Sequence, residues 1–259
     1  MKNPRLQLKI AEAGGGQVRE TALATWHLEL PTGPRSRYRL AQLDDYHAVP
    51  RSRFPWHPPF RLSLRGRASA QDLPGTWGFG LWNDPFSLSL GLGGASQRFP
   101  ALPNAAWFFY ASPPNYLSFR NDLPAQGFLA ATFRSPKLPA PLLALASPLL
   151  APAVLPIGAQ LIRWLLRQII HQDAALIQAD VIAWHTYTLD WQPQQVTLSI
   201  DGLFILTTPI VPHPPLSLVI WIDNQFAALP PKGRLSYGAL PNPEPAWIEV
   251  ELIALTQPP

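Results

Sequence analysis

The chain has 259 residues, of which 47% are hydrophobic and only 14% are charged, and its formal net charge is +4. Typical globular domains carry roughly 25% charged residues, and disordered chains combine high charge with few apolar residues, so this composition predicts a folded protein. The absence of cysteine excludes disulfides, cysteine-based zinc sites and thiol nucleophiles.

The N-terminal part of the chain is rich in arginine, and its sequence does not predict a secretory leader. Residues 1–16 contain no apolar run of 7–15 residues, so we expect a cytoplasmic protein, or one that associates peripherally with a membrane. Eight arginines fall within residues 35–67. They could meet the phosphates of nucleic acid or of anionic lipid, but a solvated set of strand and loop positions is the simpler interpretation. Because no nucleic-acid motif accompanies them, we predict no nucleic-acid partner.

Most of the chain alternates between apolar and polar residues, which is typical of half-buried antiparallel strands. In residues 60–70, Leu62 and Leu64 share one face, and Arg61 and Ser63 share the other. The further candidate strands are RLQLKIAEA (5–13), ATWHLELP (24–31), TWGFGLWND (76–84), FSLSLGLGG (86–94), AAWFFYA (105–111), NYLSFRND (115–122), GFLAATFRS (127–135), WHTYTLDW (184–191), QVTLSIDGLFILTT (195–208), PLSLVIWIDNQ (215–225) and WIEVELIALTQ (247–257). The pair Asp201-Gly202 predicts a tight hairpin turn. A dozen short strands predict one β-sandwich domain over residues 1–259.

One segment, at about 138–180, breaks this pattern and is predicted to be an insertion. It opens with an uncharged, proline-rich stretch, LPAPLLALASPLLAPAVLP (138–156), and continues with a helical pattern, IGAQLIRWLLRQIIHQDAAL (157–176). The expected apolar stripe of this helix consists of Ile157, Leu161, Ile162, Leu165, Leu166, Ile169 and Ile170. Arg163 and Arg167 are expected on the opposite side of the helix.

An uncharged stretch of this length is typical of a membrane span, but its prolines argue against one. Five prolines fall within residues 138–156, and each interior proline costs a helix about 3 kcal/mol. Two interpretations remain. The insertion could be a loop and helix packed on the sandwich, or it could be a lid or membrane-surface element with an apolar and a basic side.

The last third of the chain resembles family 16 glycoside hydrolases and related concanavalin A-like sandwiches. The resemblance rests on WHTYTLDWQPQQVTLSIDG (184–202), followed by PLSLVIWIDNQ (215–225) and WIEVELIALTQ (247–257), with GTWGFGLWND (75–84) earlier in the chain. These motifs occur in the family's order over roughly residues 60–259. The resemblance implies an all-β, concanavalin A-like jelly-roll sandwich of two antiparallel sheets.

The catalytic strand of that family is expected to correspond to AAWFFYA at 105–111. The family places Glu, Asp and Glu at alternate positions of one strand, so that all three face the cleft. Here the matching positions hold Ala105, Trp107 and Phe109, and no Asp or Glu occurs between Asp84 and Asp122. The retaining two-carboxylate mechanism therefore does not carry over, whichever register the strand takes.

Two polar clusters end apolar strands, and these supply the candidate ligand-binding residues. A tryptophan beside carboxylates and amides can stack on a sugar while the polar groups take its hydroxyls, although such residues also cap strand ends. Together with the aromatic strand, the candidate ligand-binding residues are Trp82, Asp84, Trp107, Phe109, Tyr110, Trp221, Asp223 and Gln225. We predict no metal site and no cofactor, because no metal-ligand spacing or complete phosphate loop occurs.

Three functional hypotheses follow from these features. The first is a non-glycosidase binding sandwich whose aromatic concave cleft holds an apolar, amphiphilic or carbohydrate ligand, at a membrane surface through residues 138–170. The second is an enzyme on the same scaffold that acts on a carbohydrate or a hydrophobic metabolite through Asp84 and Asp223, with His185 or Tyr110 as further candidates. The third is a structural protein whose insertion covers another subunit.

Overall fold

The computed structural model describes residues 8–47, 49–85, 101–139, 141, 143 and 152–257. Its strands form two large sheets of seven strands each, in which all neighbouring strands are antiparallel. The protein is therefore an all-β jelly-roll sandwich, as the sequence predicts. The candidate strand at 86–94 and the greater part of the proline-rich stretch lie outside the described residues.

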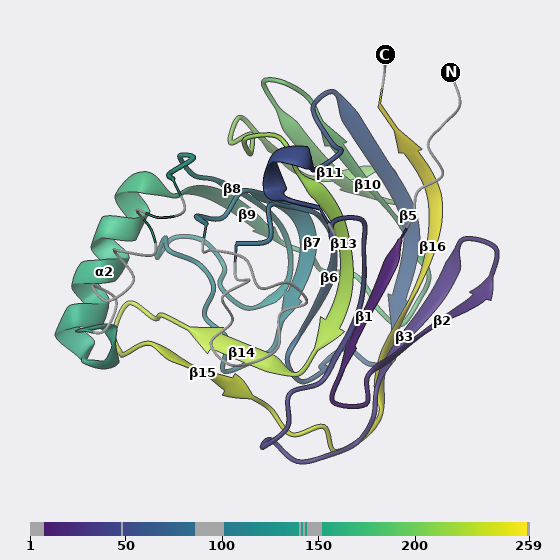
Figure 1. Ribbon diagram of the computed structural model, residues 1–259, viewed down its shortest axis with the longest axis horizontal. Helices are drawn as coiled ribbons and strands as arrows, with labels where there is room; N and C mark the ends of the chain where they lie inside the picture. Colours follow the sequence, from purple (N-terminus) through teal and green to yellow (C-terminus); the bar gives the residue numbers. More distant parts are fainter. Residues whose placement is uncertain are drawn as a thin grey trace.

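The first sheet has the strand order β1-β4-β13-β6-β7-β8-β9. Its strands are β1 (Lys9–Ala13), β4 (Leu40–Asp44), β13 (Ser217–Asp223), β6 (Thr76–Trp82), β7 (Ala105–Ala111), β8 (Gly127–Arg134) and β9 (His171–Leu176). Figure 1 shows that this sheet is curved and that its concave side faces the helix α2 (Pro156–Ile169). The strand AAWFFYA becomes β7, and all seven of its residues are buried.

The second sheet covers the other face of the first and has the order β12-β11-β10-β5-β16-β3-β2. Its strands are β12 (Leu203–Thr208), β11 (Val196–Ile200), β10 (His185–Trp191), β5 (Phe60–Ala68), β16 (Ala246–Thr256), β3 (Thr25–Leu30) and β2 (Gln17–Ala22). The predicted hairpin turn is confirmed, because Asp201 and Gly202 connect β11 to β12 with φ values of 49° and 81°. Positive φ at both central residues is the requirement of the turn that fits a twisted hairpin.

The main hydrophobic core lies between the two sheets. It contains, among others, Leu28, Leu64, Phe79, Phe108, Tyr187 and Ile220, each at most 1% exposed. β5 illustrates why the sequence folds this way, since its alternate residues from Phe60 to Ala68 are buried and those between them are exposed or half-buried. A second apolar cluster lies on the concave side of the first sheet and includes residues from β4, β13, β7 and β8.

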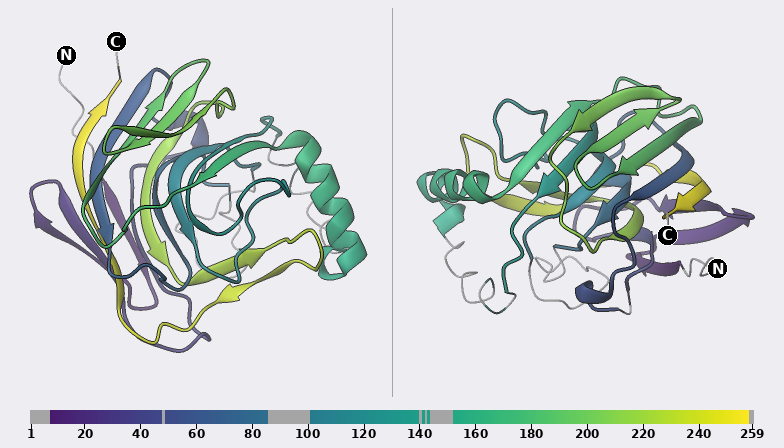
Figure 2. Two further views of the ribbon diagram at one scale, coloured as in Figure 1. Left: turned by 180° about the vertical axis from the view of Figure 1, so that it is seen from behind. Right: turned by 90° about the horizontal axis from the view of Figure 1, so that it is seen from above.

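A two-stranded ribbon, β14 (Gln225–Ala228) with β15 (Ser236–Ala239), and a 3-10 turn at Arg51–Arg53 complete the described elements. Figure 2 shows from behind and from above that α2 lies at one end of the molecule. Ala159 and Ile162 of α2 pack near Leu229 and Leu235, which follow β14 and precede β15. The ribbon therefore supports one part of the helix, and Leu166 of α2 also packs against the apolar cluster on the concave side of the first sheet.

Two sequence predictions are wrong in this region. The helical pattern was expected to run through residues 157–176, but α2 ends at Ile169 and His171–Leu176 forms the edge strand β9. Pairing with β8 outweighs helix propensity here, because Arg134↔His171 opens a continuous antiparallel ladder. Residues 115–122 do not form the expected strand, and Tyr116 makes only an isolated bridge to Ala228.

Candidate functional site

The concave face of the first sheet gathers a group of aromatic side chains, here called the aromatic cluster: Trp82, Trp107, Phe109, Phe133 and Trp221. Because side chains alternate along a strand, β7 sends Trp107 and Phe109 to this face and Phe108 to the core between the sheets. The Trp82 and Trp221 rings are stacked at 6.2 Å with an interplanar angle of 4°. The aromatic concave cleft expected from the sequence is thus formed by Trp82, Trp107, Phe109 and Trp221, with Phe133 in addition.

Glycines in β6 make room for these rings. Gly78 pairs with Phe109, and Gly80 pairs with Trp107. A Cβ atom added to Gly80 would lie 2.6 Å from the Cβ of Trp107, which is closer than two carbon atoms can approach without a shift. The Gly-Phe-Gly pattern in TWGFGLW is therefore part of how the sequence builds the aromatic cluster.

The aromatic cluster is closed on itself in this structure. Trp107, Phe109 and Trp221 are only 7%, 6% and 8% exposed, so each ring packs against its neighbours more than against solvent. The indole nitrogens of Trp82 and Trp107 are buried, and they have no hydrogen-bond acceptor among the described residues. An unpaired buried N–H group costs free energy. The packing of the rings offers these two donors no compensating hydrogen bond.

Tyr110 does not belong to the aromatic cluster, contrary to its place among the predicted ligand-binding residues. It lies on the opposite face of β7, in the core between the sheets, and its ring stacks on Trp77 at 5.7 Å. Burial raises the pKa of its hydroxyl to about 12. The single-residue offset from Phe109 is enough to place it on the wrong side of the sheet.

Asp223 is a buried carboxyl at one end of the aromatic cluster. Its Oδ1 accepts hydrogen bonds from the Thr76 hydroxyl at 2.8 Å and from the Gln225 main-chain N–H at 3.2 Å. The Trp221 indole donates to the same Thr76 hydroxyl at 3.0 Å, and the Tyr38 hydroxyl lies 3.5 Å from Asp223 Oδ2. Burial raises the pKa of Asp223 to about 7, against the opposing effect of these hydrogen bonds.

Asp84 lies at the other end of the first sheet from Asp223. Asp223 pairs with Thr76 at the start of β6, whereas Asp84 follows Trp82 at its end. The seven residues of β6 alone span roughly 20 Å at about 3.3 Å per residue, and the carboxyl pairs of glycosidases lie about 5–10 Å apart. The structure therefore does not bring the two carboxyls together as an acid and base.

The environment of Asp84 is largely that of a turn. Its side chain is buried, its φ is 49°, and its main-chain carbonyl accepts a hydrogen bond from Arg51. Arg51 also donates to the carbonyl of Asn83 at 2.7 Å. These contacts fix the end of β6, as a strand-terminal Asn-Asp pair commonly does.

His185 lies in the second sheet, away from the aromatic cluster. Its Nδ1 is 2.6 Å from Asp201 Oδ2, and its Nε2 is 2.9 Å from the carbonyl oxygen of Asp180. Asp201 also accepts a hydrogen bond from the Thr186 N–H at 2.7 Å. The hydrogen bond with His185, and after it the one from Thr186, lowers the pKa of Asp201. His185 therefore braces the β11–β12 hairpin and does not reach the concave face.

A polar network that was not predicted from the sequence lies on the concave face beside Trp221. Gln42 of β4 pairs with Trp221, and its side-chain amide donates to Asp44 at 2.8 Å and to the Tyr46 hydroxyl at 3.1 Å. The adjacent Asp45 accepts from the Trp56 indole at 2.6 Å, and burial raises its pKa to about 7. The run LAQLDDYH could have indicated a strand that ends in this cluster, because its apolar residues come first and the polar pair Asp44-Asp45 follows them.

Four of the eight arginines in residues 35–67 contact neighbouring groups, namely Arg39, Arg51, Arg65 and Arg67, which supports the simpler interpretation of that segment. Arg65 lies 3.1 Å from Glu251, and Arg67 lies 2.6 Å from Glu249, across the outer face of the second sheet. Both guanidiniums also lie about 5 Å from the centre of the Trp184 ring, at 5.2 Å and 5.1 Å. The surface formed there carries both signs of charge.

The helix α2 presents its polar and apolar sides in an unexpected way. Arg163 was expected opposite the apolar stripe, on the outer side, but it is 4% exposed and points inward. Its guanidinium donates to the carbonyls of Ser118 and Leu229 and to Asn121 Oδ1. Three carbonyl-type acceptors satisfy the buried cation, so that the helix can turn its basic residue toward the protein.

The outward side of α2 is apolar. The apolar stripe predicted from the sequence is split, because Ile162 and Ile170 are buried while other members of the stripe face solvent. The exposed residues, here called the α2 apolar face, are Ile157 (83% exposed), Leu161 (58%), Trp164 (52%), Leu165 (50%) and Ile169 (38%). Within the part of the chain that is described, none of the helices combines the length and hydropathy needed to cross a membrane.

The architecture is that of a two-sheet antiparallel jelly-roll sandwich, the fold that the sequence resemblance implies. No family model and no curated protein matches the chain. Its structural neighbours are family 16 glucanases and related sandwich proteins. They include a glycoside hydrolase family 16 endo-glucanase from Bacteroides ovatus, which is 12% identical with a TM-score of 0.49 over 98% of this chain and 97% of that one.

Two further neighbours have the same architecture. The β-glucanase of Bacillus licheniformis is 11% identical, with a TM-score of 0.48 over 99% of this chain and 95% of its own. LamAcat from Zobellia galactanivorans is 9% identical, with a TM-score of 0.47 over 90% of this chain and 77% of its own. Likeness at this level concerns architecture and does not extend to activity.

Proposed function

We propose that the protein is a non-catalytic binding protein that attaches to a membrane surface through the α2 apolar face. The observation that supports this proposal is the orientation of α2. A helix packed on a protein normally turns its apolar side inward and its charges outward. Here Arg163 is buried, while Leu161 and Trp164 are more than half exposed.

The composition of the face fits the boundary between lipid headgroups and acyl chains. Interfacial helices place leucine, isoleucine and tryptophan on the lipid side and basic residues at the border with water. Moving one side chain of this size fully out of water contributes about 1.5–3 kcal/mol. Association costs about 4 kcal/mol or more, so one exposed residue is insufficient, whereas five neighbouring ones can act together.

The rigid support beneath the helix also favours docking. Ala159 and Ile162 are fixed against the β14–β15 ribbon, and Arg163 joins α2 to residues 118–121. The helix is therefore held at the end of the molecule before it meets a membrane (Figure 2). Such preorganisation avoids the ordering cost that a disordered segment pays on binding.

Vesicle flotation with a matched pair of variants tests this proposal. The triple variant Ile157→Gln, Leu161→Gln, Leu165→Gln is expected to remain at the bottom of the gradient, whereas the wild-type protein floats with vesicles. The double variant Leu203→Gln, Phe204→Gln removes residues of β12 that are 72% and 79% exposed, and it should float like the wild type. Equal loss in both variants, or a wild-type protein that fails to float, would show that the α2 apolar face is not a membrane contact.

A second subunit could cover the same face, and light scattering separates this possibility from membrane attachment. A wild-type dimer that the triple variant converts to a monomer would assign the face to subunit contact. A monomer in both cases is the result expected for a peripheral membrane protein.

A second candidate function is binding of an amphiphilic or sugar-like ligand at the aromatic cluster. The specific observation in its favour is the pair of unpartnered indole N–H groups of Trp82 and Trp107. A ligand with oxygen acceptors and an apolar body would satisfy these donors while it contacts the rings. Because the cluster is closed here, its rings would have to move apart to admit a ligand.

Native mass spectrometry of the purified protein, with extraction and identification of bound molecules, tests this candidate. Trp107→Phe should lower the occupancy of any co-purified ligand. Trp191→Phe is the matched control, because the Trp191 indole nitrogen is also buried without a partner but lies in the core between the sheets. Purification without any bound molecule, or an equal effect of both changes, would count against a site at the aromatic cluster.

A further inference from the structure

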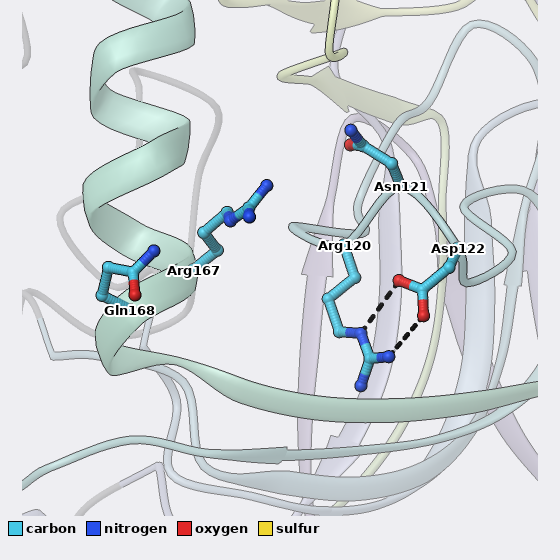
Figure 3. Close-up of a pocket in the computed structure, with 5 residues that line it drawn as sticks. All are labelled: Arg120, Asn121, Asp122, Arg167 and Gln168. Carbon is cyan, nitrogen blue, oxygen red and sulfur yellow. Dashed lines mark hydrogen bonds and ion pairs between the residues drawn. The ribbon is translucent and has the colours of Figure 1, made fainter.

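A polar pocket of about 430 Å³ lies beside the α2 apolar face. Its lining residues are Arg120, Asn121, Asp122, Arg167 and Gln168. Figure 3 shows that Arg167 points from α2 toward the segment at 120–122, and that Gln168 lies next to it on the same helix. The pocket is thus formed between the last turns of α2 and a loop of the sandwich.

The charges in this pocket favour an anion. Arg120 forms an ion pair with Asp122, in which its Nε lies 3.0 Å from Oδ1, and this contact lowers the pKa of Asp122. Arg167 makes no ion pair with any residue that the structure describes. Asp173 also acts on Arg120 from beside the pocket, and Arg163 lies next to Arg167 and bonds Asn121. The three guanidiniums of Arg120, Arg163 and Arg167 exceed the carboxylates of Asp122 and Asp173 by one positive charge.

The hydrogen-bonding groups of the pocket are also mainly donors. Asn121 Oδ1 accepts from Arg163 at 2.9 Å, so the amide nitrogen of Asn121 remains as a donor. Arg167 contributes a whole guanidinium, whose planar set of N–H groups matches phosphate oxygens. An anion with several oxygens, such as a phosphate group, can use these donors together.

The position of the pocket relative to the apolar face identifies the source of that phosphate. Arg167 and Gln168 come three and four residues after Trp164, so they lie within one turn of an exposed member of the α2 apolar face. When an amphipathic helix lies flat on a membrane, cations at the border of its apolar side meet the headgroup phosphates. The positive charge of the pocket and its position beside the α2 apolar face therefore both favour a lipid headgroup as the ligand.

We propose that the pocket between Arg120 and Arg167 receives the phosphate of an anionic lipid headgroup while the α2 apolar face lies on the membrane. This inference rests on the proposed function and adds a lipid preference to it. The apolar face supplies attachment to any fluid bilayer, and the pocket discriminates among headgroups. A phosphate monoester fits best, because it presents three terminal oxygens and more negative charge than a phosphodiester.

Quantitative flotation with three vesicle compositions tests the preference. The vesicles contain phosphatidylcholine alone, phosphatidylcholine with phosphatidylglycerol, or phosphatidylcholine with phosphatidic acid. We expect the wild-type protein to bind the phosphatidic acid vesicles most tightly. Arg167→Gln should reduce that affinity about fivefold, the effect of one basic residue near an anionic surface, and it should reduce binding to phosphatidylcholine by a smaller factor.

A charge-matched control separates the pocket from general electrostatic attraction. Arg61→Gln removes the same charge from β5 of the second sheet, where the arginine is exposed, and it should keep the preference for phosphatidic acid. Equal losses in Arg61→Gln and Arg167→Gln, or wild-type binding without any headgroup preference, would overturn the pocket while leaving membrane attachment intact. A wild-type protein that binds none of the vesicles would instead overturn the attachment itself, and this inference with it.

Soluble anions distinguish a lipid headgroup from a free phosphate. We expect inorganic phosphate and glycerol phosphate to compete weakly with the phosphatidic acid vesicles, because they lack the apolar contribution. Tight binding of either anion in the absence of vesicles, lost in Arg167→Gln, would assign the pocket to a soluble phosphate compound and refute the lipid assignment.

Discussion

The guanidinium of Arg163 lies 5.1 Å from the centre of the Tyr116 ring, on the side of α2 that faces the sandwich. The same group donates to the carbonyl of Leu229 at 2.8 Å and to Asn121 Oδ1 at 2.9 Å. Together these contacts fix the rotation of the helix about its own axis. Because Arg163 occupies the inward side, Trp164 and Leu165 are turned toward solvent.

The first prediction concerns the role of Arg163 in holding α2. Arg163→Met keeps a long side chain but removes the charged donors, which leaves buried carbonyls without partners. Hydrogen bonds to charged groups are worth about 1.5–3 kcal/mol each, so we expect the free energy of unfolding to fall by about 2 kcal/mol or more. Chemical denaturation followed by circular dichroism measures this change.

Arg167→Met is the matched control for this prediction. Arg167 lies one turn further along the same helix but is exposed, and exposed substitutions usually change stability by less than about 0.5 kcal/mol. Comparable destabilisation by the two substitutions would contradict the anchoring role of Arg163 and would indicate that α2 responds to charge alone.

The second prediction concerns the close approach of β6 to the aromatic cluster. Gly80→Ala would place a methyl group 2.5 Å from the carbonyl oxygen of Ala106 and 2.6 Å from the Cβ of Trp107. Overpacking of this kind costs about 1–3 kcal/mol, and it should also shift the tryptophan fluorescence, because Trp107 must move. Denaturation curves read by fluorescence report both effects.

Gly202→Ala separates a steric clash from simple backbone strain. Gly202 has a φ of 81°, but nothing lies within 4 Å of an added Cβ atom. We expect a loss of about 1 kcal/mol, which is the usual cost of a side chain in the left-handed region, with no change in tryptophan fluorescence. A fluorescence shift as large as that of Gly80→Ala would show that the spectral change reports lost stability and not movement of Trp107.

The sequence predicts much of the fold because its local signals agree with its tertiary structure. The Asp201-Gly202 turn, the alternation in β5 and the fully apolar β7 are each specified within a few residues. By contrast, β4 is not among the strands predicted from the sequence, because Gln42 interrupts a short apolar run. Its five residues are all buried, and a buried glutamine is stable only because Asp44 and Tyr46 complete its hydrogen bonds.

The candidate site is predicted only where alternation decides the outcome. Period two correctly groups Trp107 with Phe109, because both positions belong to β7. That Trp82 and Trp221 lie together is an expectation from the family resemblance, because these residues belong to different strands. The inward turn of Arg163 depends on main-chain carbonyls of residues 118 and 229. Main-chain acceptors of this kind cannot be recognised from residue types. The sequence therefore predicts a single apolar side for α2, whereas in the structure the apolar residues lie on two sides of the helix.

The last prediction concerns the pH dependence of stability that two buried carboxyls create. Burial raises the pKa values of Asp223 and Asp45 to about 7 in the folded protein, whereas an aspartate in an unfolded chain has a pKa of about 3.9. Between these values the folded state holds protons that the unfolded state has released. The free energy of unfolding should therefore fall as the pH rises from about 4 to about 7, and the contribution of these groups should be constant above that range.

Asp223→Asn isolates the part of this effect that belongs to Asp223. The amide keeps an oxygen that can accept from Thr76 but cannot ionise, so the variant should show a shallower loss of stability between pH 4 and 7. The difference in unfolding free energy between pH 5 and pH 8 should shrink by up to about 2.6 kcal/mol, because about two of the three pH units that separate the two pKa values fall within this window. Glu244→Gln, at an exposed position, should leave the slope unchanged. Chemical denaturation at a series of pH values measures these slopes. If Asp223→Asn keeps the full wild-type slope, then Asp223 is ionised in the folded protein throughout this range, and other groups cause the loss of stability.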